Sequence, residues 1–363
     1  MPSKIALIAF DCWYHFNNIL NVLKNYSDNF VIIVPYGTNI KAEFKNYFEI
    51  YYIRYKSGLI ADIKSSKAFI SILRILRLNK VKTVHITSAR PFWLFPIYFL
   101  FRFNPNKKLI FTIHEPFKRE GDISTKFMYR FYLYPDRYLS FKLADYLIFG
   151  GKKILNKAKK EIITPARLIY AELGAYTYLD NLKSQSSDFN ENQIIFFGRI
   201  QAYKGLHILI ESTKHLETED FKIIIAGKGS IDYNAQVNHL LNSKKLRIYN
   251  RYIKDGELVA MIRSSAVAVF PYLSGTQSGA TSTALGLNVP VISSEIGSIH
   301  EIIKEGKTGY IIPPNNPKIL AEKLDKILNN RSLQREMRNC IMQENLKINS
   351  NLRNKLVNLY SIF

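Results

Sequence analysis

The sequence predicts an α/β protein with two domains, each built on a parallel β-sheet that helices cover on both faces. The chain has 363 residues, which is long for one hydrophobic core and ordinary for two. Short apolar runs alternate with helical patterns twice along the chain, and a polar segment rich in Ser and Asn separates the two series. We therefore predict a first domain over residues 1–178, a linker over 179–192, a second domain over 193–345 and a C-terminal helix over 346–363.

The first series consists of Val-, Ile-, Leu- and Phe-rich runs, which are typical of parallel strands buried on both faces. The predicted strands lie at residues 4–10, 29–37, 48–55, 81–88, 108–116, 144–151 and 166–174. Between two of them, residues 65–79 have apolar side chains at three- and four-residue spacing, which predicts an amphipathic helix.

The second series repeats this alternation and predicts a second sheet. Its strands are expected at residues 194–200, 221–229, 246–253, 267–273, 290–295 and 309–314. Residues 280–287 predict a helix, and residues 331–363 read as helices. Because open parallel sheets bind ligands beyond the carboxyl ends of their strands, functional residues are expected in the loops that follow the strands.

The composition narrows the class of protein. The hydrophobic fraction of 47% and the aromatic fraction of 13% exclude a disordered chain. Only Cys12 and Cys340 are present, which excludes a disulfide framework and fits a reducing compartment. The apolar run at the N-terminus is short and lacks a small-residue cleavage site, so we interpret it as the first strand and not as a signal peptide.

The formal net charge is +22, and most of the basic excess lies in residues 1–180, with the densest cluster at residues 152–160. Such a surface attracts the phosphates of nucleic acids or of anionic lipids, and the aromatics interleaved with cations over residues 126–142 favour lipid; a solvated basic face is the alternative. The apolar stretch at residues 91–103 is too short to span a bilayer. It predicts a buried helix or, alternatively, a helix that enters a membrane surface.

One loop region of the second domain carries residues suited to phosphate. Gly198 and Arg199 follow a predicted strand, and Lys204 precedes a helix. Arginine can bind phosphate oxygens through two parallel N–H groups, lysine adds a compact charge, and glycine lets a ligand approach the backbone. We predict that these cations hold a diphosphate, the alternative being two solvated surface cations. Gly227 lies in a second glycine-rich turn, after the next strand.

A second region, VFPYLSGTQSGATSTALGLNVPVISS at residues 269–294, contains no charged residue although the chain is strongly basic. It leaves a strand, crosses a loop of small and hydroxyl residues and enters a predicted helix. Backbone N–H groups and a helix N-terminus would then meet at the edge of the sheet. Such an end binds an anion without charged side chains, so the segment predicts an anion site made by its backbone.

Taken together, FFGRIQAYKG, IIIAGKGS, the neutral segment continued by EIGSIHEII, and GKTGYIIPP resemble the ordered motifs of a large glycosyltransferase family. This is the retaining GT-B family of bacterial mannosyl- and glucosyltransferases, of the glycosyltransferase family 4 type. The resemblance covers most of residues 194–314, and FTIHEP in the first domain is similar to the family's strand-end histidine loop. It implies a GT-B fold, in which two Rossmann-like, doubly wound domains face each other across a cleft. The nucleotide sugar would bind the second domain and the acceptor the first, and the last helix would pack back on the first domain.

The resemblance also implies roles for individual residues. It implies that His114 lies beside the reacting sugar and that Arg199 and Lys204 bind the diphosphate. These three are the expected catalytic residues. The donor-binding positions predicted with them are Gly198, Gly227, Gly275, Thr276, Gln277, Ser278, Gly279 and Thr283.

This chain departs from the family at two positions. Many members have two glutamates separated by seven residues in the loop and helix of the neutral segment, and the second usually binds the ribose. Here these positions are Gly275 and Thr283. The chain resembles a subset with a TQSG-like loop, in which Thr283 would offer the ribose a hydrogen bond weaker than that of a carboxylate.

Loops of the first domain offer further candidates for contacts to the sugar or the acceptor, with ordinary loop polarity as the alternative. These candidates are Asp11, His15, Asn17, His85, Arg90 and Glu115. No His, Cys, Asp or Glu cluster has metal-ligand spacing and no Asp-x-Asp occurs, so we expect no metal and no cofactor. The donor, UDP- or GDP-linked, would be a substrate.

The expected function is transfer of a hexose or N-acetylhexosamine from a nucleotide sugar to a glycan or lipid-linked acceptor. The resemblance implies retention and a place in bacterial surface polysaccharide, lipopolysaccharide or glycoconjugate synthesis. The expected location is the cytoplasm or the inner face of the cell membrane, with an anionic membrane surface as partner and no nucleic acid. Three alternatives stay open: a degenerate non-catalytic GT-B scaffold, a nucleotide-sugar epimerase, and a basic nucleic-acid-binding protein.

Overall fold

The computed structural model divides the chain into two compact units. The first comprises residues 1–173 and 350–363, and the second comprises residues 174–349. The described residues are 4–11, 13–38, 40–55, 67–88, 94–114, 116, 134–172, 174–181, 189–232, 234–275 and 278–361.

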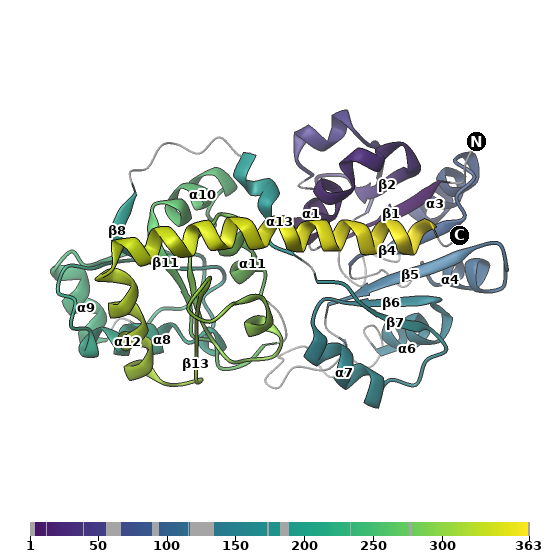
Figure 1. Ribbon diagram of the computed structural model, residues 1–363. Coiled ribbons are helices and arrows are strands. Elements are labelled where there is room, and N and C mark those ends of the chain that lie inside the picture. Colours follow the sequence, from purple (N-terminus) through teal and green to yellow (C-terminus); the bar gives the residue numbers. More distant parts are fainter. Residues whose placement is uncertain are drawn as a thin grey trace. The chain divides into compact units, whose positions relative to one another are not determined.

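The first unit is built on a seven-stranded sheet in the order β3-β2-β1-β4-β5-β6-β7, in which all neighbouring strands are parallel (Figure 1). The strands are β1 (Ile5–Ile8), β2 (Phe30–Pro35), β3 (Glu49–Ile53), β4 (Thr83–Ile86), β5 (Lys108–Ile113), β6 (Tyr146–Phe149) and β7 (Arg167–Tyr170). The central strands are buried along their whole length, as their continuous apolar runs predict. Strand order reverses next to β1, so the loops after β1 and β4 lie at the switch point where open sheets bind ligands.

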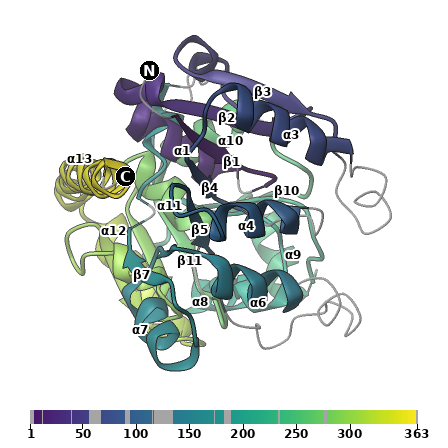
Figure 2. The ribbon, with the colours of Figure 1, turned by 90° about the vertical axis from the view of Figure 1, so that its right-hand side faces the viewer.

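Helices pack on both sides of this sheet. The helices are α1 (Trp13–Leu23), α3 (Lys67–Leu78), α4 (Phe95–Arg102), α6 (Tyr134–Leu143) and α7 (Lys152–Glu161). The apolar sides of α3, α4, α6 and α7 share one core cluster with Ala6, Ile8 and other inward residues of the strands. Figure 2 shows α3, α4 and α6 one below another along this face. These helices therefore bury one side against the sheet and turn the other outward.

The second unit is built on a six-stranded parallel sheet in the order β10-β9-β8-β11-β12-β13. Its strands are β8 (Asn190–Phe197), β9 (Lys222–Ala226), β10 (Leu246–Tyr249), β11 (Ser265–Phe270), β12 (Val291–Ser294) and β13 (Gly309–Ile312). Its helices are α8 (Leu206–Ser212), α9 (Ala235–Asn242), α10 (Asp255–Arg263), α11 (Gly279–Gly286) and α12 (Pro317–Leu328). The order reverses between β8 and β11, which places the loops after these two strands at the second switch point.

The chain ends in one long helix, α13 (Arg331–Ser361), drawn in yellow in Figure 1. The sequence reads as helices here, with a separate segment over 346–363, whereas the structure has a single helix because no Gly or Pro interrupts residues 331–361. Residues from 350 onward belong to the first unit, where the Tyr360 hydroxyl lies 2.7 Å from Nδ1 of His85 on β4. The end of α13 is therefore held by the first sheet.

The strands of both series form where the sequence predicts them, and the unit boundaries differ slightly from the predicted domain limits. The first unit ends at residue 173 and not at 178 because the segment from Gly174 packs on α11. Tyr176 N donates to Ser282 O at 3.1 Å, and a Cβ on Gly286 would lie 2.7 Å from the Tyr176 backbone. This close backbone contact assigns Tyr176 to the second unit although it lies before the predicted linker.

Candidate functional site

The loops after β8 and β9 cross at a pair of glycines in the second unit. Gly198 N donates to Ala226 O at 2.9 Å, and a Cβ on Gly227 would lie 1.9 Å from Gly198 O. Both glycines have positive φ, 109° for Gly198 and 151° for Gly227. Only glycine allows this approach and this backbone conformation together, so the crossing explains both residues. Their predicted role in donor binding stays a prediction.

The loops after β8 and β9 stay paired beyond this crossing, where Ile200 N donates to Lys228 O at 3.0 Å. The side chain of Asn250, in the loop after β10, binds the backbone of Gly229 in the loop after β9. Its Oδ1 accepts from Gly229 N at 3.0 Å, and its Nδ2 donates to Gly229 O at 3.0 Å. Three neighbouring strands thus end in loops that fix one another, which makes a rigid edge.

Arg199 and Lys204 project from this edge. Arg199 is exposed, and Lys204 ends the 3₁₀ turn η6 (Ala202–Lys204) just before α8. The Lys204 ammonium lies 5.3 Å from the centre of the Tyr272 ring, and a Cβ on Gly198 would be 3.1 Å from Lys204 Nζ. A cation held by an aromatic face and lying next to Gly198 is placed to meet an anion at this edge. The two predicted cations therefore lie on the same loop at the same edge.

The loop after β11 is fastened to the same region. Leu273 N donates to Tyr203 O at 2.7 Å, and the Tyr272 hydroxyl lies 3.3 Å from Ser278 Oγ. Burial raises the pKa of the Tyr272 hydroxyl, so this side chain is a neutral phenol at ordinary pH. Ser278 Oγ also accepts from Thr281 N at 3.2 Å and so caps α11.

The N-terminus of α11 supplies the predicted backbone anion site. Gly279 opens the helix, and its N–H belongs to the first turn, whose N–H groups have no acceptor within the helix. Gly275 has φ of 156°, and its nearest neighbours on the side of a Cβ are the side chains of Ile299 and Ile296. Thr276 and Gln277, also predicted for donor binding, lie outside the described residues.

Thr283, the predicted ribose contact, points into its own helix. Its Oγ1 donates to Gly279 O at 2.8 Å, and the residue is 5% exposed. A buried hydroxyl whose proton is used by the i−4 carbonyl has only its lone pairs left for a ligand. In this structure the hydroxyl proton of Thr283 is therefore used within its own helix.

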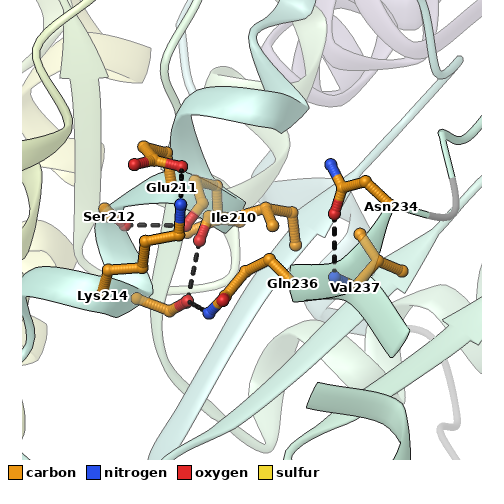
Figure 3. Close-up of polar contacts among 9 residues, drawn as sticks. Ile210, Glu211, Ser212, Lys214, Asn234, Gln236 and Val237 are labelled. Carbon is orange, nitrogen blue, oxygen red and sulfur yellow. Dashed lines mark hydrogen bonds and ion pairs between the residues drawn. The ribbon is translucent and has the colours of Figure 1, made fainter. Parts of the chain in front are cut away.

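A cavity of about 290 Å³ lies beside the loop after β8. Its apolar walls come from Ile200, Leu206, Ile210, Ile225 and Val237. Figure 3 shows polar contacts of α8, α9 and the turn after α8; at the start of α9, Asn234 Oδ1 accepts from Val237 N at 3.0 Å. On the same side, Gln236 Nε2 donates to Thr213 Oγ1 at 2.9 Å. The cavity is therefore held between two helices whose ends are fixed.

In the first unit, His114 follows β5 at the edge where the loops after β1 and β4 also end. His114 Nε2 lies 2.8 Å from Thr87 O, an acceptor, so Nε2 carries the proton and donates. When the ring is neutral, its Nδ1 is then an acceptor that suits a hydroxyl group. His114 is half-buried at the edge of the sheet, which agrees with the position expected of a residue that contacts a sugar.

His15 packs edge-on against His114, with ring centroids 4.9 Å apart. It is 3% exposed, and neither ring nitrogen has a hydrogen-bond partner among the described residues. Burial, then the neighbouring His114 and His85, lower the pKa of His15 well below its ordinary value. His15 is thus a neutral imidazole behind His114.

His85, another candidate for sugar contact, lies in the interior of the first unit. It is fully buried, with Nδ1 2.7 Å from the Tyr360 hydroxyl and Nε2 2.9 Å from Thr112 Oγ1. Burial, with a smaller effect of His114, lowers its pKa to about 3. With both nitrogens engaged, His85 joins β4 and β5 to the end of α13.

The remaining candidates of the first unit are divided between its edge and its interior. Asp11 N donates to Ser88 Oγ at 3.3 Å, which ties the loops after β1 and β4 together, and Asp11 is partly exposed. Asn17 is 1% exposed, and its Oδ1 accepts from Lys41 N at 3.2 Å. Arg90 and Glu115 lie outside the described residues.

Sequence reasoning missed several residues that build these edges, namely Thr87, Ser88, Asn250, Tyr272 and Tyr360. Each acts through a partner far along the chain, so no local spacing marks it. Their one sequence signal is position, because Thr87, Ser88, Asn250 and Tyr272 each lie within two residues of the end of a strand. Within the described residues, no three His, Cys, Asp or Glu side chains are grouped as metal ligands. None of the helices in the described part has the length and apolar character that crossing a bilayer requires.

Comparison with known proteins shows what the second unit is similar to. Residues 180–343 match the family model described as "Glycosyl transferases group 1". A relative in Methanocaldococcus jannaschii, an uncharacterized glycosyltransferase, is 27% identical over 48% of this chain and 45% of its own length. The capsular polysaccharide biosynthesis glycosyltransferase CapM of Staphylococcus aureus is 26% identical over 43% of each chain. The chain thus spans less than half the length of these curated relatives.

Solved structures extend the likeness to the whole chain. HepE of Anabaena, in complex with UDP, superposes with a TM-score of 0.67, with coverage of 99% of this chain and 100% of its own, at 11% identity. At this identity the likeness shows the fold. Residues 180–343 are therefore similar to a group 1 glycosyl transferase domain, and the chain as a whole has the two-sheet GT-B fold.

Proposed function

We propose that this chain is a glycosyltransferase that takes a hexose or N-acetylhexosamine from a nucleotide sugar and transfers it, with retention, to a glycan or lipid-linked acceptor. The observation that carries the proposal is the edge of the second sheet, where Arg199, Lys204 and the first turn of α11 lie within one set of mutually fixed loops. The residues of this edge lie within the segment that matches the group 1 glycosyl transferase model, which supports the proposal.

The chemistry of transfer fits such an edge. The bond from the anomeric carbon to the diphosphate breaks with its electron pair staying on the diphosphate, a bond to the acceptor oxygen forms, and the acceptor hydroxyl passes its proton to the departing phosphate oxygen. Negative charge grows on the departing diphosphate, and preformed positive groups stabilise it without reorganisation. We propose that Arg199 binds the phosphate oxygens, Lys204 adds charge, and the N–H groups of Gly279 and its neighbours complete the site without a metal ion.

We propose that His114 contacts the transferred sugar from the first unit. Its Nε2 proton is used by Thr87 O, so a neutral ring presents Nδ1 as an acceptor for a sugar hydroxyl. His15 behind it stays neutral and therefore does not force a positive charge onto this edge. His114→Ala should raise KM for the nucleotide sugar but leave Kd for the free nucleotide nearly unchanged, because only the contact to the sugar is lost.

Two comparisons bear on substrates and pathway. HepE binds UDP, which favours a uridine donor over the GDP-linked alternative, and CapM acts in capsular polysaccharide biosynthesis. We therefore propose a UDP-sugar donor and a surface polysaccharide or lipopolysaccharide product.

The test is a thermal-shift titration with UDP, GDP and CMP, followed by a transfer assay. Arg199→Ala and Lys204→Ala should each lower turnover by on the order of 10²-fold, as the loss of one charge-stabilising donor does elsewhere. Lys222→Ala is the matched control, because Lys222 is an exposed cation at the opposite end of β9. Full activity in both variants would overturn the site.

The same assays separate the alternatives that the sequence left open. A degenerate scaffold would show no stabilisation by any nucleotide. An epimerase would convert the donor without an acceptor, and NMR of the sugar would show a new epimer. A nucleic-acid-binding protein would be stabilised by duplex DNA in a strongly salt-dependent way and by no mononucleotide.

A further inference from the structure

The outer side of the helical layer on the first sheet combines exposed apolar side chains with cations. The layer is formed by α3, α4 and α6, which lie next to one another in Figure 2. The exposed large apolar residues on these helices and at their ends are Ile70, Leu78, Phe99, Leu100, Phe103 and Tyr138. We call these six residues the α3–α4–α6 patch. Phe99 and Phe103 stack on each other and α4 packs against α6, and exposed apolar side chains gathered in this way mark an interaction site in a soluble protein.

On α3 the outward positions include both apolar and basic side chains. Ile70 is 67% exposed and Leu78 is 68% exposed, and Arg74 and Arg77 occupy the exposed turns between them. The spacing of four, three and one residues keeps all four on one side of the helix. An apolar stripe with long arginines beside it is the pattern of a helix that lies in a lipid interface, where the guanidinium groups reach the headgroups.

On α4 the outward positions are aromatic. Phe99 and Phe103 are one helical turn apart, with rings stacked at 6.2 Å, and Phe103 is 77% exposed. Leu100 is next to them and 51% exposed, and Tyr138 lies on α6, which packs against α4. The inward residues of the same helix, Ile97, Tyr98 and Phe101, are buried in the core and are not part of this surface. The predicted buried helix is therefore buried on one side only.

The charge of this layer identifies the occupant. No acidic residue occurs in α3 or α4, and Arg102 at the end of α4 meets Asp145 at 3.5 Å. The next helix on the same face, α7, adds five exposed lysines, at 152, 153, 157, 159 and 160, and a single acid, Glu161. Such a surface repels another basic protein, including a second copy of this chain, and attracts a dense anionic plane.

We propose that the α3–α4–α6 patch binds the surface of an anionic lipid bilayer, with the apolar side chains entering the headgroup boundary and the surrounding Arg and Lys contacting lipid phosphates. This surface belongs to the first unit and needs no nucleotide, so it is independent of the proposed transfer reaction. It would bring a lipid-linked acceptor to the unit that carries His114.

The test is co-sedimentation of the full chain with vesicles, without nucleotide. The wild type should bind vesicles of phosphatidylglycerol and phosphatidylcholine at low salt, bind pure phosphatidylcholine weakly, and be released at roughly 0.5 M salt, where charges are screened. The double variant Phe99→Ser/Phe103→Ser should lose on the order of 10²-fold in affinity. Arg74→Gln/Arg77→Gln should lose about tenfold, and only on anionic vesicles.

The chain offers a matched control. Met342 and Leu346 on α13 are also one helical turn apart, and they are 48% and 71% exposed, close to the values of Phe99 and Phe103. Glu344, which pairs with Lys304 and Lys347, lies between them, whereas α3 and α4 contain no acidic residue. Met342→Ser/Leu346→Ser should leave vesicle binding unchanged, and an unchanged Tm in all variants shows that they fold.

Three results would overturn the proposal. One is no binding of the wild type to anionic vesicles at low salt, and another is equal loss of binding in the control variant. The third is a dimer in solution that the Phe99→Ser/Phe103→Ser variant dissociates, which would make the patch a contact between two copies. Activity on a soluble acceptor analogue is measured separately, so failure of membrane binding and failure of the transfer reaction can be told apart.

Discussion

Replacing Gly205 with alanine should disturb the site edge through one backbone contact. Gly205 directly follows Lys204, has φ of 69° and packs against the loop after β11. A Cβ on Gly205 would lie 1.9 Å from Pro271 O, whereas real Cβ atoms stay beyond 3.0 Å. The two backbones must therefore separate by a little more than 1 Å. Pro271 precedes Tyr272, which contacts both Lys204 and Ser278, so the shift moves the cation relative to the N-terminus of α11.

The magnitude follows from these two effects. A left-handed conformation costs alanine about 1–2 kcal/mol, and overpacking against the backbone adds about 1–3 kcal/mol. Since about 1 kcal/mol lowers Tm by about 2–4 °C in a domain of this size, the variant should melt several degrees lower. Misplacing a catalytic group by about 1 Å can lower turnover by on the order of 10²-fold.

Gly306→Ala is the matched control for Gly205→Ala. Gly306 has φ of 70°, and a Cβ at this position would have no neighbouring atom within 4 Å, so the variant carries the same backbone strain without the clash. Thermal unfolding and a transfer assay on both variants separate the two contributions. If both lose the same Tm and both keep wild-type turnover, the contact between the loops does not position Lys204 and the reasoning fails.

Three other changes test the structure. Folding lowers the pKa values of His15 and His85, so the unfolded chain binds these two protons at a higher pH than the folded chain does. The free energy of unfolding should therefore be largest above the unfolded pKa of about 6.5 and should fall as the pH drops toward the pKa values of the folded state. Urea unfolding should show that the free energy of unfolding is lower near pH 5 than near pH 7.5, with about 2 kcal/mol of the difference due to His85 alone. His85→Phe should reduce this pH dependence, and an equally steep dependence in the variant would contradict the assignment. Ser278→Ala should cost about 1 kcal/mol and Ser278→Gly a few tenths, because the side chain caps α11; equal Tm values in the two variants would show that the cap contributes nothing. Asn250→Ala removes both hydrogen bonds to Gly229 and should cost about 1–2 kcal/mol in thermal unfolding, while an unchanged Tm would mean that the turn holds itself.

The sequence predicted where the cations of the candidate site lie, and it said less about its hydroxyl groups. Arg199 and Lys204 are in the loop after a strand, where open parallel sheets bind ligands, and their role in the site stays a prediction. Thr283 is predicted as a ligand contact, but its hydroxyl bonds to Gly279 O within the helix. His85 is likewise predicted as a sugar contact, but a histidine near the end of a strand can equally point inward. In the structure its ring is hydrogen-bonded to Tyr360.

The apolar runs of the sequence are enough to locate the strands, because a parallel strand buried on both faces is mostly apolar. The order of the two series follows from them, and so do the sheet edges at which Gly198, Arg199 and His114 lie. The sequence does not show which polar side chains face inward, because His15 and His85 are buried against residues distant in sequence and the Thr283 hydroxyl turns into its own helix. The solvent exposure of Phe99 and Phe103 is also visible only in the folded chain. A helix of continuous apolar residues does not itself show which of its sides the sheet will cover.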